Sequence, residues 1–487
     1  MEVMNLQNRK HWIFKKHTNN IDVLIDVATY LKDQKSDISS DEKKRMFNTL
    51  KQNSVYKPRK STRNMPLDSI NHRIDELSYY MFGYSKKIEN KKKFIFSPLG
   101  NLFLNHINDK EKTSKIFATM LAGIQFPHPA SLPSEDFELY PFRLIFKLLL
   151  DSRLEGKLYN YEIYQHLIYL DRINPEIYER LIQDILDSRK LSDEEKFIKV
   201  KSQEDIIVKS VYEWEYYVLK LLCSQGIFIS QSGDVLGKVY HPTKNPNTVK
   251  TGRKVTNSSF ELNREIKEYI SRLTEEYTIY DAVLSLDNDS MIRSDIIKEI
   301  YSFYPDLLLD ELSLSSDGID NEIIKLPKLI EKYSLNENGE TFNQFEDILE
   351  EAFNLFYNVE AERVSGPGRT DIECMYLEIR EKFAVDAKST SKKLPGINAG
   401  RLARHRRLIG AKYTIVITPR YVPSVKYDID GQEIVIIKAN TFAEYIYNYL
   451  ATGIREIDFG ELREIILSHM GKDISLQVSE QTLSKFG

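Results

Sequence analysis

Asp371 and the triplet Asp386-Ala-Lys388 are the residues of this chain whose types and spacing are best suited to chemistry. The surrounding sequence predicts two strands joined by a short hairpin, and successive side chains of a strand point to opposite faces. Asp386 and Lys388 therefore share one face, and antiparallel pairing can bring Asp371 beside Asp386. Two carboxylates next to an ammonium group suit metal-assisted hydrolysis of a phosphodiester, because the acids hold a divalent cation and the lysine offsets charge on the phosphate.

The segments around this pair are predicted to form a sheet flanked by helices. An amphipathic helix over residues 342–357 precedes it, with apolar residues at helical spacing. An arginine-rich helix follows, and then come apolar strands at residues 413–418 and 433–438 and a helix over residues 441–450. The C-terminal part is therefore predicted to be an α/β domain.

This α-β-β-β-α-β order, over residues 340–455, resembles the core of the PD-(D/E)xK nucleases, the fold of many restriction endonucleases. Asp371, Asp386-Ala-Lys388 and Leu394-Pro395 look like the cleavage domain of FokI-type type IIS enzymes, although Thr370-Asp371 stands where the family has Pro-Asp. The resemblance implies Mg²⁺ as the cofactor. It also implies that Asp371, Asp386 and the main-chain carbonyl of Ala387 ligate the metal and that Lys388 is catalytic.

Two helices are expected to add residues to this site. In the PD-(D/E)xK fold a helix carboxylate often joins the metal ligands, and Glu351 is our first candidate, followed by Glu350 and Glu346. A solvated helix residue is the alternative for Glu351. The arginine-rich helix carries Arg401, Arg404, His405 and Arg407, which partly share a face. Arg401 and Arg404 are candidates for contacts with the DNA backbone, an exposed basic helix being the alternative, and the fold needs no histidine as a general base.

The N-terminal half is predicted to contain small helical units with hairpins. A helix from Pro66 to Tyr84, a lysine-rich turn and a helix from Leu99 follow the order of a winged helix-turn-helix. Apolar runs around Ser232-Gly233 predict a further hairpin after Gly226. Over about residues 60–240 the pattern resembles the recognition half of the AlwI and BstNBI group of type IIS restriction and nicking enzymes.

The predicted architecture is a multidomain α+β protein. Residues 1–260 would form a DNA-recognition region of winged-helix-like units, residues 261–338 a helical linker, and residues 339–487 the PD-(D/E)xK nuclease domain. A partly separate helical subdomain is the alternative for residues 261–338, where the chain is polar and acidic.

Composition and charge narrow the class of protein. Apolar residues make up 41% and charged residues 29% of the 487 positions, as in soluble globular proteins, and no apolar run reaches the length of a membrane span. The two cysteines are far apart, so a disulfide framework is not expected. We expect a cytoplasmic protein.

The net charge of −4 does not exclude a nucleic-acid partner, because recognition depends on local patches. Lys250, Arg253 and Lys254 lie in one such basic cluster and are candidate DNA contacts.

These observations predict a restriction endonuclease that cuts double-stranded DNA at a fixed distance from its recognition site. The FokI and AlwI resemblance implies a transient homodimer through the cleavage domain, and the family implies a companion DNA methyltransferase. The alternatives are a strand-specific nicking enzyme, a modification-dependent nuclease, or a winged-helix regulator whose nuclease-like domain is not catalytic. No phosphate-binding loop for ATP is present in the sequence.

Overall fold

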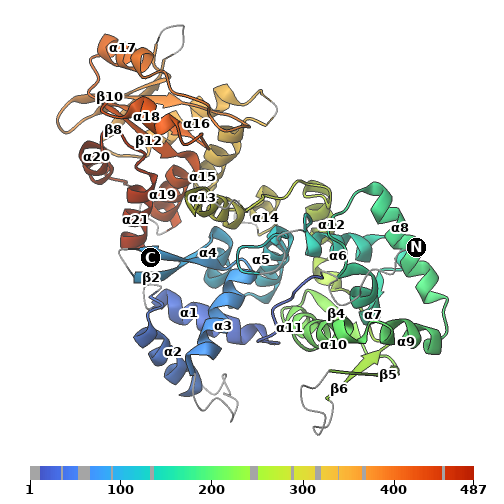
Figure 1. Cartoon of the computed structure of the whole chain (residues 1–487). Helices are drawn as coiled ribbons and strands as arrows, with labels where there is room; N and C mark the ends of the chain where they lie inside the picture. The colour runs from blue at the N-terminus through green and yellow to red at the C-terminus, as the bar shows by residue number, and fades with distance from the viewer. Residues whose placement is uncertain are drawn as a thin grey trace. The chain divides into compact units, whose positions relative to one another are not determined.

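The computed structural model describes residues 11–33, 37–52, 66–88, 91–131, 137–241, 251–286, 290–312, 320–337, 339–364, 369–451 and 456–486. The chain divides into two units, Met1–Leu312 and Ser313–Gly487, each with its own core (Figure 1). Helices and strands occur in both, so the predicted mixed α+β class is confirmed. Within these described ranges, no helix is long and apolar enough to cross a membrane.

In its described residues the first unit is mainly helical with three small antiparallel sheets, which pair as β1-β2, β3-β7-β4 and β5-β6. Its elements are α1 (Ile21–Asp33), α2 (Ser40–Gln52), α3 (Pro66–Tyr79), β1 (Gly83–Ile88), β2 (Lys91–Phe96), α4 (Pro98–Asn105), α5 (Lys110–Gly123), α6 (Pro141–Leu150), a 3₁₀ turn (Ser152–Leu154), β3 (Lys157–Tyr159), α7 (Asn160–Glu162), a π-helix (Ile163–Leu167), α8 (Pro175–Arg189), α9 (Asp193–Lys201), α10 (Glu204–Glu213), a π-helix (Trp214–Val218), α11 (Leu219–Ser224), β4 (Phe228–Gln231), β5 (Val235–Tyr240), β6 (Gly252–Thr256), β7 (Ser259–Leu262), α12 (Arg264–Glu276), α13 (Ser290–Tyr301) and α14 (Asp306–Glu311).

The predicted order of helix, basic hairpin and helix is present as α3, β1-β2 and α4. Ser97 begins α4 as its N-cap: its hydroxyl accepts the N–H of Gly100 at 2.9 Å and donates to the carbonyl of Met81 at 2.6 Å. Gly100 is needed because a Cβ there would clash with the carbonyl oxygen of Phe82. The helix is therefore fixed against the base of the hairpin. A winged-helix topology stays a prediction.

The hairpin predicted after Gly226 is wrong. The two apolar runs do form strands, β4 and β5, but they belong to different sheets. β4 pairs with β7, where Phe228 is opposite Leu262, and β5 pairs with β6. The strands that follow residue 250 offer better partners than the local turn, because pairing with them buries Val239, Val255 and Phe260. Local turn chemistry could not reveal these distant partners.

The second unit is built on one five-stranded sheet of order β12-β11-β10-β9-β8. β10, β11 and β12 are parallel, whereas β9 runs antiparallel to β10 and to β8. Its elements are α15 (Asp320–Leu335), α16 (Phe342–Asn354), β8 (Val359–Arg363), β9 (Ile372–Tyr376), β10 (Glu381–Ala387), α17 (Ala399–Ile409), β11 (Thr414–Thr418), α18 (Val425–Ile429), β12 (Ile434–Lys438), α19 (Ala439–Ala451), α20 (Phe459–Ser468) and α21 (Ser475–Phe486).

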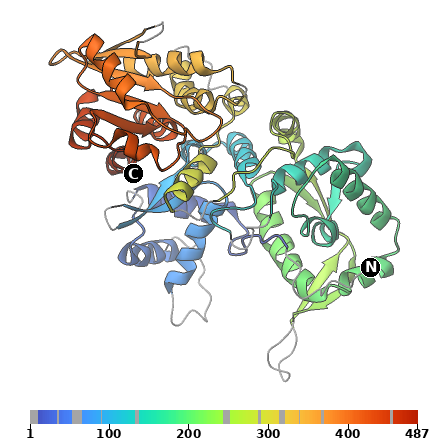
Figure 2. The same ribbon diagram turned by 45° about the horizontal axis from the view of Figure 1, so that its top comes forward.

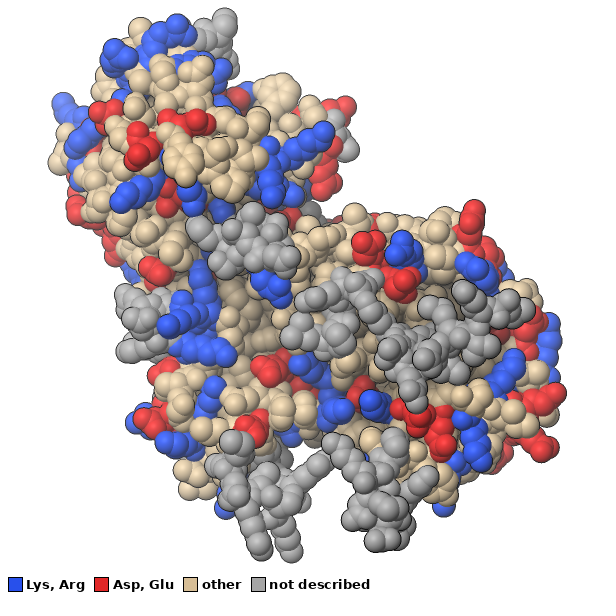
Figure 3. Space-filling model, in the orientation of Figure 1, with Lys and Arg blue, Asp and Glu red and all other residues tan. Residues whose placement is uncertain are grey.

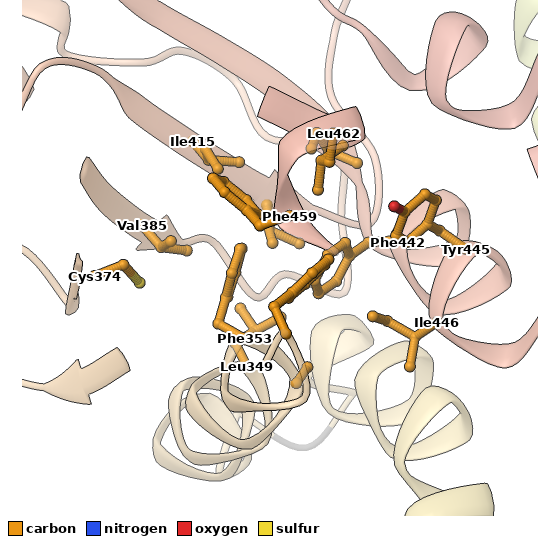
Figure 4. Packing of buried hydrophobic residues seen from close by; sticks show 14 of the residues in the cluster. Leu349, Phe353, Cys374, Val385, Ile415, Phe442, Tyr445, Ile446, Phe459 and Leu462 are labelled. Atoms are coloured by element: carbon orange, nitrogen blue, oxygen red, sulfur yellow. The ribbon is translucent and has the colours of Figure 1, made fainter. Parts of the chain in front are cut away.

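Helices cover both faces of this sheet (Figure 2). The larger core lies between the sheet and α15, α16, α19, α20 and α21, and it includes Phe383 and Val385 of β10. Figure 4 shows Leu349 and Phe353 of α16 directed toward this apolar face. The smaller core, with Leu402 of α17 and Val416 of β11, lies on the other face. β10 is therefore packed between two helical layers, which hold in place the strand that carries Asp386 and precedes Lys388.

The structure divides residues 261–338 differently from the predicted linker. α12 packs on α5 and α6, and α14 also packs on α5, so these helices belong to the first unit. α15 packs on α16 and α19 and belongs to the second. Leu326 and Ile330 of α15 join the large core of the second unit. Each of these helices packs where its apolar face becomes buried. The polar, acidic composition of residues 261–338 gave no indication of these apolar faces.

The first unit should lose stability in acid because it contains buried neutral histidines. His128 is 1% exposed, and its Nδ1 accepts the N–H of Ala130 at 3.1 Å. Burial lowers the pKa of His128 from 6.5 to about 3. Below pH 6.5 the unfolded chain binds a proton that the folded chain refuses, so the free energy of unfolding falls as the pH falls toward 3.

We expect His128→Gln to reduce this pH slope by up to about 1.4 kcal/mol per pH unit. Urea unfolding followed by tryptophan fluorescence measures it, because Trp12 and Trp214, the two tryptophans of the chain, both lie in the first unit. His469→Gln in the second unit is the control, because both tryptophans report on the first unit. An unchanged slope in His128→Gln would contradict the assignment.

Candidate active site

The register of β9 and β10 brings Asp371 beside Asp386. Ile372 is opposite Val385, so Asp371, one residue earlier, reaches the end of β10. The main-chain N–H of Ala387 donates to Oδ2 of Asp371 at 2.8 Å. Asp386 pairs in register with Val416 of the smaller core, while Phe383 and Val385 enter the larger one. The alternation of β10 therefore separates a chemical face from an apolar face.

Lys388 completes the cluster. Its ammonium nitrogen lies 2.5 Å from Oδ2 of Asp386 and 3.8 Å from Oδ2 of Asp371. The side chain of Asp386 is only 2% exposed, and its Oδ2 accepts no hydrogen bond of acceptable geometry within the described ranges. The ammonium group of Lys388 is therefore the cation that offsets the charge of this buried carboxylate oxygen.

Burial and neighbouring charges together shift the pKa of Asp371. Burial raises the pKa of Asp371, and the neighbouring Asp386 carboxylate raises it further. Lys388 and the N–H of Ala387 act in the opposite direction. One ammonium group thus lies beside two carboxylates, and the guanidinium of Arg401 also acts on Asp371. A divalent cation bound by both carboxylates would further offset their mutual repulsion.

The donors fit a hard cation bound through oxygen. Asp371 and Asp386 supply carboxylate oxygens, which Mg²⁺ prefers. In the part of the chain that is described, no group of three or more His, Cys, Asp and Glu side chains is arranged as a metal site. Further ligands must then come from the main chain, water or the substrate. Mg²⁺ is commonly bound in this way, by one or two carboxylates together with phosphate.

Thr370 has a structural role that its hydroxyl explains. It is buried, and its Oγ1 donates to the carbonyl of Val385 at 3.1 Å. The carbonyl of Asp371 accepts the N–H of Val364 at 2.9 Å. Side-chain and main-chain hydrogen bonds therefore fix the start of β9 from both sides. This hydroxyl replaces the rigidity that a proline would provide at the same position.

Arg363 of β8 donates hydrogen bonds to three acidic residues of α16. The guanidinium of Arg363 donates to Glu346 at 2.8 Å and to Asp347 at 2.5 Å, and its main-chain N–H donates to Glu350 at 3.0 Å. Burial and then the Asp371 carboxylate raise the pKa of Glu346, so Glu346 lies within the field of the site. No pattern in the sequence indicated the role of Arg363.

Glu351 lies elsewhere on the same helix. It is exposed, and five residues at about 100° each turn it about 140° away from Glu346. The structure therefore brings Glu346 toward Asp371 and leaves Glu351 facing solvent. Sequence spacing alone could not rank these acids, because the ranking depends on the angle at which α16 crosses the sheet.

α17 lies over the face of the sheet that carries Asp386, and Figure 3 shows basic side chains over it. Arg401 is exposed and lowers the pKa of Asp371, so it lies near the cluster. Arg404 is also exposed, while Nε of Arg407 donates to the carbonyl of Ala403. His405 is buried, and burial, followed by Arg401 and Arg404, lowers its pKa. The guanidinium groups of Arg401 and Arg404 are therefore exposed on α17, and that of Arg401 lies near Asp371.

Comparison with known proteins identifies the family. A family model described as type II restriction endonuclease HgaI, N-terminal domain, matches residues 7–277. The type II restriction enzyme HgaI of Avibacterium volantium is 52% identical over 487 residues, which are 100% of both chains. The chain belongs to the HgaI family of type II restriction endonucleases. These enzymes are site-specific deoxyribonucleases, and the predicted enzyme class is confirmed.

Solved structures with a similar course of the chain are more distant. The BpuJ1 endonuclease binding domain, in complex with modified DNA, is 15% identical with a TM-score of 0.41, and the match covers 62% of this chain and 99% of that domain. The restriction endonuclease FokI is 11% identical with a TM-score of 0.30, and the match covers 95% of this chain and 99% of FokI.

The region matched by the HgaI N-terminal domain contains the predicted DNA contacts of the first unit. Arg253 of β6 stacks on Tyr212, with 4.4 Å between the guanidinium carbon and the ring centroid, and Lys254 is exposed beside it. Stacking of this kind holds a guanidinium in place at little cost in entropy. Lys250 lies outside the described residues.

A comparison of two acids of α16 tests the geometry. We expect Glu346→Gln to lower DNA cleavage by roughly 10- to 100-fold, because it removes a charge from the field around Asp371. Glu351→Gln should change cleavage by less than about twofold, since that side chain faces solvent. Cleavage rates at several Mg²⁺ concentrations provide the measurement, with Asp347→Asn as a control that also weakens the contact with Arg363. Equal losses in Glu346→Gln and Asp347→Asn would assign the effect to Arg363 instead.

Proposed function

We propose that this chain is a Mg²⁺-dependent type IIS restriction endonuclease. Residues within 1–260 would recognise a short duplex sequence, and the domain over 339–487 would hydrolyse a phosphodiester bond at a fixed distance from it. The convergence of Asp371, Asp386 and Lys388 on one end of β10, in a member of a restriction endonuclease family, carries this proposal.

The residues of the cluster have distinct roles in this reaction. Asp371, Asp386 and the main-chain carbonyl of Ala387 would hold Mg²⁺. A bound Mg²⁺ polarises the phosphate and lowers the pKa of water. Lys388 offsets the negative charge that develops on the phosphate in the transition state, and its position beside both carboxylates fixes its orientation. Glu346, in preference to Glu351, would tune the charge of the site from α16.

DNA is held through charge at both units. Arg401 and Arg404 would bind phosphates next to the scissile bond. Arg253, Lys254 and Lys250 would contact DNA from the recognition region. The enzyme would act in the cytoplasm beside a methyltransferase that protects the host sequence. The grouping with AlwI and BstNBI stays a prediction.

Cleavage of plasmid DNA in Mg²⁺ tests the proposal directly. We expect the wild type to give discrete fragments. Asp386→Ala should lower cleavage by roughly 10³-fold and Lys388→Ala by roughly 10²-fold, because each removes charge from the reacting centre. Both variants should still bind DNA in a mobility-shift assay. Lys412→Ala is the matched control, since Lys412 pairs with Glu381 at the opposite end of β10.

Binding of DNA by the wild type without cleavage in Mg²⁺ or Mn²⁺ would reject the nuclease assignment in favour of a regulator. Nicked circles without linear product would identify a strand-specific nicking enzyme. Cleavage restricted to methylated plasmid would identify a modification-dependent enzyme.

A transient homodimer of the cleavage domain would cut both strands. Leu408 of α17 is 72% exposed and Tyr427 of α18 is 83% exposed, and both helices lie on the face that carries Asp386. Burying one leucine stabilises an interface by about 1.5–3 kcal/mol.

We therefore expect Leu408→Glu to lower double-strand cleavage by more than about tenfold. The dependence of the initial rate on enzyme concentration checks this, because a dimer gives a steeper than linear dependence. Leu377→Glu is the control: Leu377 is an exposed leucine in the turn between β9 and β10, at the far end of the strand. A linear dependence in the wild type would contradict the dimer.

A further inference from the structure

The β1-β2 hairpin concentrates positive charge. The segment Lys86-Lys-Ile-Glu-Asn-Lys-Lys-Lys93 contains five lysines and one glutamate. Lys87 is directly opposite Lys92, and Lys86 is directly opposite Lys93. Directly opposite residues of an antiparallel pair project from the same face, so both faces of the hairpin carry lysines near its tip. Figure 3 shows basic side chains gathered over β2.

This arrangement works against the stability of the hairpin. Like charges directly opposite each other repel, so each such pair destabilises the free hairpin. Among the described residues, Lys87, Lys92 and Lys93 make no ion pair with an acidic side chain. Lys43 of α2 adds to the repulsion, because burial and then the charge of Lys92 lower its pKa. Three lysines of the hairpin, Lys87, Lys92 and Lys93, thus lie close to like charges without an acidic partner among the described residues.

The base of the hairpin is held rigidly. Phe94 and Ile95 are buried, and the N–H of Ser97 donates to the carbonyl of Phe82 at 2.9 Å. On the outer edge of β2, the N–H of Ile38 donates to the carbonyl of Lys92 at 3.1 Å. The ring of Tyr84 packs against Tyr301, with centroids 5.2 Å apart. The main chain that carries the lysines is therefore ordered before any ligand arrives, which reduces the entropy lost on binding.

We propose that the β1-β2 hairpin is a binding site for the phosphate backbone of duplex DNA. This proposal rests on the proposed function, and it adds the hairpin to the DNA contacts proposed above. Lysine is a flexible point charge without the planar fork by which arginine reads guanine, so the hairpin supplies affinity and orientation and does not select the sequence. The repulsion stored in the free hairpin is relieved when phosphates lie between the ammonium groups.

The double variant Lys87→Ala/Lys92→Ala tests this proposal, because it removes one directly opposite pair and leaves the base intact. The probes are two short duplexes, one that the wild type cleaves and one that it does not. Binding is measured by fluorescence anisotropy without Mg²⁺ over a series of KCl concentrations. We expect weaker binding of both duplexes by the same factor, on the order of tenfold.

The salt dependence gives a second, independent readout. The slope of log K against log of the salt concentration should become shallower by about 2, since each neutralised phosphate contributes about 0.9. The matched control is Lys44→Ala/Lys190→Ala. It removes two exposed lysines that pair with Asp41 and Asp187, and it should leave the slope unchanged. Thermal unfolding of the hairpin variant should occur at the same or a higher temperature, because repulsion is removed.

The outcomes separate this proposal from the proposed function. An unchanged affinity and slope would overturn the hairpin assignment while the enzyme still bound and cut DNA. A loss confined to the cleaved duplex would also overturn it, because it would show base recognition. Retained DNA binding with loss of an acidic protein partner would assign the hairpin to that partner. Failure of the wild type to bind either duplex would instead reject the proposed function.

Discussion

The candidate site depends on one main-chain contact, the hydrogen bond from the N–H of Ala387 to Oδ2 of Asp371. This contact holds a carboxylate at the end of β10 where Asp386 already lies, although two like charges in a site of low polarity repel by up to several kcal/mol. The pair persists because β10 cannot move. Phe383 and Val385 are locked in the large core and Val416 in the small one. The packing of both faces stabilises the fold and so offsets the cost of holding the two carboxylates close together.

The same constraint explains which parts of this site could be predicted from the sequence. Alternation along a strand is local, so Asp386 and Lys388 could be assigned to one face and Phe383 and Val385 to the other from the order of residues alone. The boundaries of β11, β12 and α19 were also predictable, because their apolar runs are long and bounded by polar residues. What failed depends on distant partners. β4 and β5 bind β7 and β6, which no turn signal between Gly226 and Leu236 could indicate. The role of Glu351 stays a prediction. The preference for Glu346 depends on how α16 lies against β8, and Arg363, which contacts Glu346, belongs to no motif.

The net charge of −4 does not show how positive and negative residues are distributed over this protein. Acidic residues are paired where they are structural. Glu381 lies between Arg463 and Lys412, and Glu162 binds Arg189. The two charges of such an ion pair offset each other, so the pair creates little electrostatic potential around it. Elsewhere among the described residues like charges lie close together. Asp371 and Asp386 adjoin each other beside Lys388, lysines lie opposite each other on the β1-β2 hairpin, and exposed arginines lie on α17. Opposite signs at these places suit one polyanionic substrate and one divalent cation.

This distribution also bears on the order of events in DNA cleavage. Basic patches act over about a Debye length, roughly 8–10 Å at physiological salt, and capture DNA without regard to sequence. Under the proposed function, the carboxylates of Asp371 and Asp386 would repel phosphate at this range, and Lys388 offsets part of that repulsion. The domain would therefore bind DNA less well at its reacting end without a divalent cation. If the first unit recognises DNA as proposed, it would raise the local concentration of DNA at the second unit, and a cation held by Asp371 and Asp386 would offset their repulsion of phosphate. Under the proposed function, the charge of the carboxylate pair, which is costly for the fold, would then also oppose cleavage in the absence of the cation.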